Sequence, residues 1–238
     1  FLKKIYAARS VTESQLSLSL PGLLKRNFEQ LDVALNLLQR AITENRRILI
    51  VGDFDADGAT ASSVAIKSLR MMGSKSVDFL VPNRFEHGYG LSCEIVKVAL
   101  EYEPDLIITV DNGISSVNGV EYARNQGVSV LITDHHLPGN ELPNANVIIN
   151  PQLIDDEFPS KNLAGVGVIF YILLALRSKL KEIGWFETYQ YITYKPPKHM
   201  TSNVSTSLRA RVKGCPSERS FTSVPSSYIP TASNIDSV

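Results

Sequence analysis

Three aspartates at alternate positions follow a short apolar run near residue 50. The run covers residues 48–51, and the carboxylates are Asp53, Asp55 and Asp57. On an extended chain, alternate side chains point to the same side, so these three like charges would lie close together. Such a cluster is strongly repulsive unless a cation lies among its oxygens, and hard oxygen ligands suit Mg²⁺, Mn²⁺ or Ca²⁺. The stretch therefore predicts a metal site at the end of a buried strand.

The same stretch copies the first half of an EF-hand calcium loop. That loop requires a bidentate Glu at its twelfth position and a helix that enters it. Here the twelfth position is Val64, and an apolar strand enters instead of a helix. These two departures make an EF-hand the weaker interpretation. A solvated acidic turn is a further alternative, and the other strand ends of the chain argue against it.

Polar residues follow three further apolar runs in the same way. They are Arg84 after the run at 77–81, Asp111 with Asn112 and Gly113 after the run at 106–110, and Asp134 with His135 and His136 after the run at 128–133. Ligands of an open parallel sheet bind beyond the carboxyl ends of its strands, so we expect these residues to meet the first three carboxylates. Aspartates combined with histidines fit a pair of divalent cations, with Asp111 suited to bridge them and the imidazoles favouring Mn²⁺.

A site of this kind also predicts a reaction class. Two divalent cations about 3.5–4 Å apart bind a phosphoryl group and generate hydroxide from a shared water at neutral pH. The sequence therefore predicts phosphoester hydrolysis, in which Arg84, Asn112 and Gly113 would hold phosphate oxygens. Arg84 has the alternative of a surface ion pair with Glu86.

Strands and helices alternate along the chain with the regularity of a parallel α/β sheet. Apolar runs predict strands at 48–51, 77–81, 106–110, 128–133 and 147–150. Apolar stripes with three- and four-residue spacing predict helices at 27–45, 59–72, 92–102, 117–125 and 165–180. The predicted fold class is a Rossmann-like α/β domain with a parallel sheet.

Composition indicates a soluble globular protein with a distinct last segment. Of the 238 residues, 44% are hydrophobic and 20% charged, and no apolar run is long enough to span a membrane. We therefore expect a cytoplasmic protein without a membrane partner. Residues 1–187 carry an acidic excess and so lack the basic excess expected of a self-sufficient nucleic-acid binder. Residues 188–238 are basic and rich in Ser, Thr and Pro. That composition predicts a mostly disordered tail.

Five motifs, taken in order, resemble those of a known family. They are Val51 to Thr60, Pro82 to Arg84 with Gly88 to Leu91, Val110 to Ser116, Thr133 to Gly139, and Ala164 to Val168. Together they are similar to the DHH phosphoesterases, whose name-giving triplet corresponds to Asp134 to His136 here. Within that family they are most similar to the single-stranded-DNA-specific exonucleases of the RecJ type, over residues 1 to about 187.

The resemblance implies 5′-to-3′ degradation of single-stranded DNA in recombination and repair, with Mn²⁺ or Mg²⁺ as cofactor. Single-stranded DNA is thus the implied partner, and protein partners are unknown. By position, the resemblance assigns metal ligation to Asp55, Asp57, Asp111 and His135, catalytic contact with metal or the scissile phosphate to His136, and supporting roles in that chemistry to Asp53 and Asp134.

The last 51 residues depart from the family pattern. RecJ-type proteins continue past the Gly-Trp-Phe at 184–186 into a segment whose Asp completes the metal site, then into a DHHA1-type domain and an OB-fold, and none of these follows here. We therefore expect a truncated N-terminal piece, with a lead-in and helix at 1–45, an incomplete DHH domain at 46–187 and the tail at 188–238. A phosphoesterase of short oligonucleotides and an inactive fragment are the alternatives.

Overall fold

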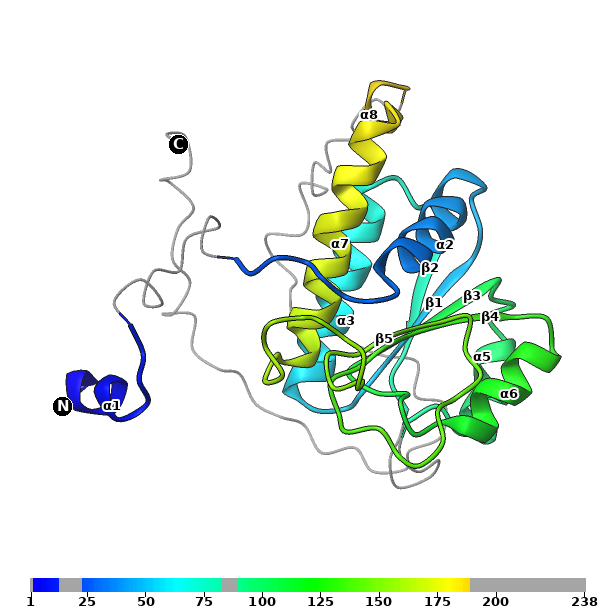
Figure 1. The fold of residues 1–238 in the computed structure, drawn as a ribbon. Coiled ribbons are helices and arrows are strands. Elements are labelled where there is room, and N and C mark those ends of the chain that lie inside the picture. The colour runs from blue at the N-terminus through cyan, green and yellow to red at the C-terminus, as the bar shows by residue number, and fades with distance from the viewer. Residues whose placement is uncertain (1, 13–22, 83–89, 189–238) are drawn as a thin grey trace, which may run out of the picture. The chain divides into compact units, whose positions relative to one another are not determined.

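Five parallel strands form one sheet at the centre of the computed structural model (Figure 1). The structure describes residues 2–12, 23–82 and 90–188. The strands lie in the order β2-β1-β3-β4-β5, so β1 and β3 are neighbours although β2 lies between them in sequence. Their bounds are β1 Ile48–Gly52, β2 Val77–Leu80, β3 Leu106–Val110, β4 Ser129–Thr133 and β5 Val147–Ile149.

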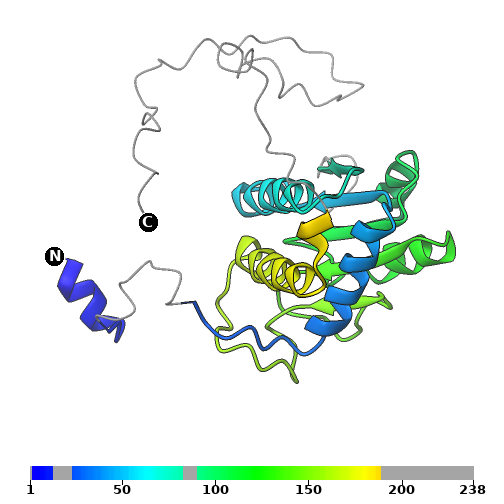
Figure 2. The same cartoon turned by 90° about the horizontal axis from the view of Figure 1, so that it is seen from above.

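Helices cover both faces of this sheet (Figure 2). Helices α2 (Leu31–Thr43), α3 (Ala56–Met71) and α7 (Gly165–Glu182) lie on one face, and α5 (Cys93–Leu100) and α6 (Val117–Asn125) lie on the other. Successive strand residues point to opposite faces, so Ile48 and Ile50 pack under the first group while Leu49 and Val51 pack under the second. Burial on both sides explains why β1, β3 and β5 are continuous apolar runs without alternation, whereas the edge strand β2 carries the exposed Asp78.

The predicted α/β fold is confirmed. Three helices begin at different residues from those expected: α2 and α3 by several residues, and α5 by one residue, at Cys93. Helix α2 begins at Leu31, because Phe28 lies in the preceding segment and stacks on Phe158 with ring centroids 4.3 Å apart. Helix α3 begins at Ala56, because the Asp55 side chain accepts a hydrogen bond from the Gly58 N–H at 2.9 Å and caps it. The acidic stretch is therefore extended only as far as Asp55.

The two ends of the described chain differ in their packing. Residues 23–43 share one hydrophobic core with α3 and α7, through Phe28 and the buried face of α2. Helix α1 (Leu2–Ala8) has exposed side chains from Lys3 onward. At the other end, α8 (Trp185–Thr188) follows α7, and the Trp185 indole donates a hydrogen bond to the Met72 carbonyl at 2.9 Å.

Two predictions concern residues outside the described part. Arg84 belongs to the segment 83–89, and all but the first residue of the predicted tail belongs to 189–238. Within the described residues, no helix has both the length and the apolar character needed to cross a membrane.

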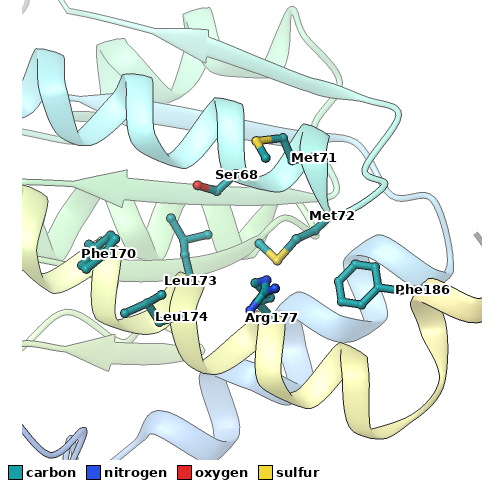
Figure 3. Close-up of a pocket in the computed structure, with 8 residues that line it drawn as sticks. All are labelled: Ser68, Met71, Met72, Phe170, Leu173, Leu174, Arg177 and Phe186. Atoms are coloured by element: carbon teal, nitrogen blue, oxygen red, sulfur yellow. The ribbon is translucent and has the colours of Figure 1, made fainter. Parts of the chain in front are cut away.

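An apolar pocket of about 140 Å³ lies between α3 and α7 (Figure 3). None of its lining residues is acidic or a histidine, and Met71 and Met72 place it at the C-terminal end of α3. The acidic stretch lies at the opposite end of that helix, so this pocket does not belong to the predicted metal site. Its lining residues are Ser68, Met71, Met72, Phe170, Leu173, Leu174, Arg177 and Phe186.

Candidate metal centre

The carboxyl ends of neighbouring strands bring the predicted acidic residues together. The Asp53 N–H donates to the Val110 carbonyl at 3.3 Å, and the Asp111 N–H donates to the Thr133 carbonyl at 3.0 Å. These bonds continue the ladders by one residue, so residues directly after β1, β3 and β4 lie side by side. The chain passes from β1 to β2 on one side and then to β3 on the other side of β1, so the direction in which strands are added reverses between β1 and β3. Ligands of open α/β sheets bind at such a switch point.

Asp111 lies at the centre of two overlapping groups of potential ligands. One oxygen each from Asp53, Asp55 and Asp111 lie within 4.8 Å of one another. Asp111 also forms a second group of the same dimension with His135 and His136. In this second group, His135 Nε2 and Asp111 Oδ1 are 3.0 Å apart. Asp111 is thus the residue that the two groups of potential ligands share.

Burial gives Asp111 unusual electrostatics. Its side chain is 1% exposed, and its backbone has φ 62°, a left-handed conformation that is uncommon for residues other than glycine. Burial, reinforced by the charges of Asp57 and Asp55, raises the pKa of the Asp111 carboxyl from 3.8 to about 7. Its Oδ1 lies 3.0 Å from His135 Nε2 and accepts no other hydrogen bond from the described residues. A buried, ionised carboxylate requires a positive partner.

Asp57 reaches the centre from a helix rather than from an extended chain. It belongs to the first turn of α3, and its Oδ2 lies 3.8 Å from His135 Nε2. Both of its oxygens also accept hydrogen bonds from the start of α7, from the Gly165 N–H at 2.8 Å and the Val166 N–H at 2.7 Å. The expectation that alternate spacing aligns Asp57 with Asp53 and Asp55 on one strand is therefore wrong, because the chain turns into α3 at Asp55.

Asp134 organises the loop that carries the two histidines. Its Oδ1 accepts the N–H groups of His135 and His136 at 2.7 and 3.1 Å and lies 2.7 Å from His136 Nδ1, while its Oδ2 accepts the Ile114 N–H at 2.9 Å. Desolvation lowers the pKa of His136, but the hydrogen bond to Asp134 and the surrounding carboxylates outweigh it, so that the pKa is raised. Asp134 therefore orients His136 and favours its protonated form.

The residues predicted to hold phosphate oxygens make other contacts. The buried Asn112 amide donates to the carbonyls of Val51 and Val110 at 3.0 and 2.9 Å, which fastens β1 to β3. Gly113 has φ 111°, and a Cβ there would lie 2.5 Å from the Thr109 hydroxyl. Both positions thus have structural reasons for their residue type, and these contacts do not support phosphate binding by Asn112. Arg84 lies outside the described residues.

Gly165 and Val166 also contact the site, although the sequence predicted no role for either residue. They belong to the fifth motif, at the start of an apolar helix, and approach the centre through backbone N–H groups. A glycine pair at the N-terminus of a helix, Gly165 and Gly167, is the only signal that the sequence contains for them.

The residues present fit divalent cations. Within the described chain, no Lys or Arg forms an ion pair with Asp53, Asp55, Asp57 or Asp111, although their oxygens are crowded. Carboxylate oxygens and imidazole nitrogens are the donor set that Mn²⁺ accepts, and Mg²⁺ accepts the carboxylates. The buried Oδ1 of Asp111, which lies 3.0 Å from His135 Nε2 and accepts no other hydrogen bond from the described residues, is an atom that a cation would contact.

A known family matches the part of the chain that contains all of these residues. The model described as "DHH family, N-terminal domain" matches residues 47–198. The chain belongs to the DHH family. The DHH triplet itself is Asp134, His135 and His136, which are the residues that pair with one another and with Asp111.

Relatives within the DHH family share a name. The single-stranded-DNA-specific exonuclease RecJ of Dickeya dadantii (strain 3937) is 54% identical over 187 residues, which are 78% of this chain and 32% of that protein. The chain thus spans about a third of the length of the curated relatives it matches. The resemblance to RecJ-type exonucleases predicted from the five motifs is confirmed by this identity.

Two solved structures of the same kind contain manganese. The exonuclease RecJ bound to manganese is 37% identical with a TM-score of 0.59, covering 64% of this chain and 38% of that one. RecJ of Thermus thermophilus in complex with Mn²⁺ is 31% identical with a TM-score of 0.60, covering 74% of this chain and 24% of that one.

Proposed function

We propose that this chain is the metal-binding part of a divalent-metal-dependent exonuclease that degrades single-stranded DNA from the 5′ end in recombination and repair. The observation that carries the proposal is that ligand atoms of Asp55 and of His135 each lie close to Asp111, at the strand ends of a DHH domain. The names of relatives about half identical to it support single-stranded DNA as the substrate. A role in DNA degradation also supports the predicted cytoplasmic location.

The proposed ligands are Asp55, Asp57, Asp111 and His135, with Asp111 shared between two cations. A pair of Mn²⁺ or Mg²⁺ ions, when bound, supplies a hydroxide from water at neutral pH and neutralises phosphate charge. Asp111 is buried and prearranged for this task, since its neighbours on β1 and β4 hold it in place through the ladder. Asp57 is fixed by two backbone N–H groups before any cation arrives.

His136 is the proposed proton donor of the reaction. Hydrolysis of a phosphodiester forms one bond from phosphorus to the water oxygen and breaks another to a sugar oxygen, which must receive a proton. Asp134 holds the His136 ring through Nδ1 and raises its pKa, so the protonated form persists toward neutral pH. Its position near Asp111 would place that proton beside the phosphate.

The experiment that tests the proposal is release of nucleotides from 5′-labelled single-stranded DNA by the purified 238-residue chain with Mn²⁺. We expect release in the parent and its loss, by about 10²-fold or more, in Asp111→Asn, which keeps the shape but removes the shared charge. Asp78→Asn is the matched control, because Asp78 is an exposed aspartate on the edge strand β2. It should retain full activity.

Three outcomes of this assay would count against the proposal. Absence of release by a folded parent chain would show that the chain holds the DHH fold without the chemistry. Release that persists in Asp111→Asn would assign the activity to a contaminant or another site. Faster turnover of dinucleotides than of longer strands would favour the phosphoesterase of short oligonucleotides.

A further inference from the structure

We infer that the first turn of α7 is a wall of the metal centre and that Gly165 is a positioning residue, required because only a residue without a side chain leaves room for the Asp111 carboxylate. This inference rests on the proposed metal centre and deepens it. It concerns a residue that would touch neither cation nor DNA and would act through Asp111 and Asp57.

The space above Gly165 is filled by Asp111. A Cβ built on Gly165 would lie 2.7 Å from both Cβ and Cγ of Asp111, and closer still to Oδ1. Cβ atoms in proteins essentially never approach other atoms to less than 3.0 Å. Asp111 has little freedom to retreat, because its side chain is buried and its N–H is bonded to Thr133. A methyl group at position 165 would therefore displace the carboxylate.

The same turn of α7 also holds Asp57. The N–H groups of Gly165 and Val166 donate to its two oxygens at 2.8 and 2.7 Å. The residue before the helix, Ala164, provides no side-chain cap, so the N-terminus of α7 is satisfied by Asp57, which lies 108 residues before Gly165 in the sequence. Two proposed ligands, Asp57 in α3 and Asp111 directly after β3, thus lie against the same turn. A shift of that turn would move both of them.

Gly167 offers a matched comparison on the same helix. A Cβ at Gly167 would meet only the Leu163 side chain, at 2.5 Å from Cδ1, and a leucine side chain can change rotamer. Both glycines lie in the first turn of α7, so replacement by alanine gains the same helix propensity at each position. The two variants differ in whether the new methyl group meets a proposed ligand.

The test is Mn²⁺ binding to the full chain, measured by titration calorimetry for the parent, Gly165→Ala and Gly167→Ala. We expect Gly165→Ala to weaken binding by about 10- to 100-fold, the usual effect of removing support behind a metal ligand. Gly167→Ala should bind like the parent. Equal affinity in all three proteins would overturn the inference, as would an equal loss in both variants.

A double-mutant cycle covers the case in which Gly165→Ala fails to fold. Asp111→Gly removes the carboxylate and suits the left-handed backbone at that position, where φ is 62°. In the metal-free chain, Gly165→Ala should lower the unfolding temperature of the parent but not that of Asp111→Gly. An undiminished effect in the Asp111→Gly background would mean that Asp111 is not what the methyl group meets, and the inference would be wrong.

Failure of the proposed function gives a different result from failure of this inference. If the parent chain binds Mn²⁺ but releases no nucleotides, the proposed nuclease activity is wrong, and the expected difference in Mn²⁺ affinity between Gly165→Ala and Gly167→Ala still tests the inference. If the parent binds Mn²⁺ and cleaves DNA, and Gly165→Ala does both equally well, the proposed function holds and the positioning role of Gly165 is wrong. A folded parent without Mn²⁺ binding would overturn both.

Discussion

Protonation of Asp111 contributes to the stability of the metal-free chain. The pKa of this carboxyl is raised to about 7, so between about pH 4 and 7 the folded chain keeps a proton that the unfolded chain releases. The free energy of unfolding therefore falls as pH rises through that window and levels off above it. Because the pKa rises from 3.8 to about 7, the loss of unfolding free energy is at most about 4 kcal/mol.

Asp111→Asn should remove this pH dependence while abolishing the effect of Mn²⁺. In urea unfolding with a chelator, we expect the variant to be more stable than the parent at about pH 8, and to lose most of that advantage at about pH 5, where the parent carboxyl is already protonated. If the difference in unfolding free energy between variant and parent is the same at both pH values, burial does not raise the pKa of Asp111 as described. Added Mn²⁺ should stabilise the parent and leave the variant unchanged.

At the scale of the elements, α3 and α7 are joined by the hydrogen bonds of Asp57 as well as through their apolar sides. Asp57→Ala should leave two N–H groups at the start of α7 without a partner and cost about 1–2 kcal/mol of unfolding free energy. Parent and Asp57→Ala should be compared at about pH 5.5, where Asp111 is protonated. At that pH, removing Asp57 relieves no charge repulsion with Asp111, so the loss of the two hydrogen bonds is not masked. Thermal or urea unfolding without metal measures it.

Asp32 provides the control for this comparison. It lies exposed in the first turn of α2, where the helix has no side-chain cap bond, so Asp32→Ala removes only a favourable charge near a helix N-terminus. We expect a loss of about 0.5 kcal/mol. Equal losses at both positions would mean that Asp57 contributes as a charge and not as a cap of α7.

At the scale of the whole molecule, the folding unit begins earlier than the DHH family match at residue 47. The Leu24 N–H donates to the Tyr171 hydroxyl at 3.0 Å, the Glu29 N–H to Asp156 at 3.1 Å, and the Ile148 N–H to Gln30 Oε1 at 3.1 Å. Phe28 is 4% exposed and packs against both Phe158 and Tyr171, which also contact each other. A chain that starts at residue 47 would expose this core.

Deletion of residues 1–46 should therefore abolish cooperative unfolding. Loss of Phe28 alone corresponds to about 3–5 kcal/mol, and the buried face of α2 adds several similar contributions, which together reach the net stability of a typical domain. Deletion of residues 1–22 is the control, because the helix α1 that it removes exposes its side chains from Lys3 onward. A cooperative transition at the parent temperature after removal of 1–46 would show that α2 is dispensable.

Much of the fold could be predicted from the sequence because the signals are local. Apolar runs of four to six residues and stripes of 3.6-residue period arise from neighbours along the chain, and they located every strand of the sheet. The general rule that ligands gather beyond the carboxyl ends of parallel strands then predicted that Asp55, Asp111 and His135 would meet. That rule needs no knowledge of which strands are neighbours.

Contacts made at a distance in sequence depended on the tertiary structure. The capping of α7 by Asp57, the pKa of Asp111 and the insertion of Phe28 against Phe158 each require that α2, α3 and α7 pack on the same face of the sheet. The residues near Asp111 in the sequence do not indicate how deeply its side chain is buried, or that Gly165 lies against it. The sequence by itself determined the elements and the chemical types at their ends, because these follow from local periodicity. Packing decided which oxygen meets which donor, because burial and close approach are properties of the assembled layers.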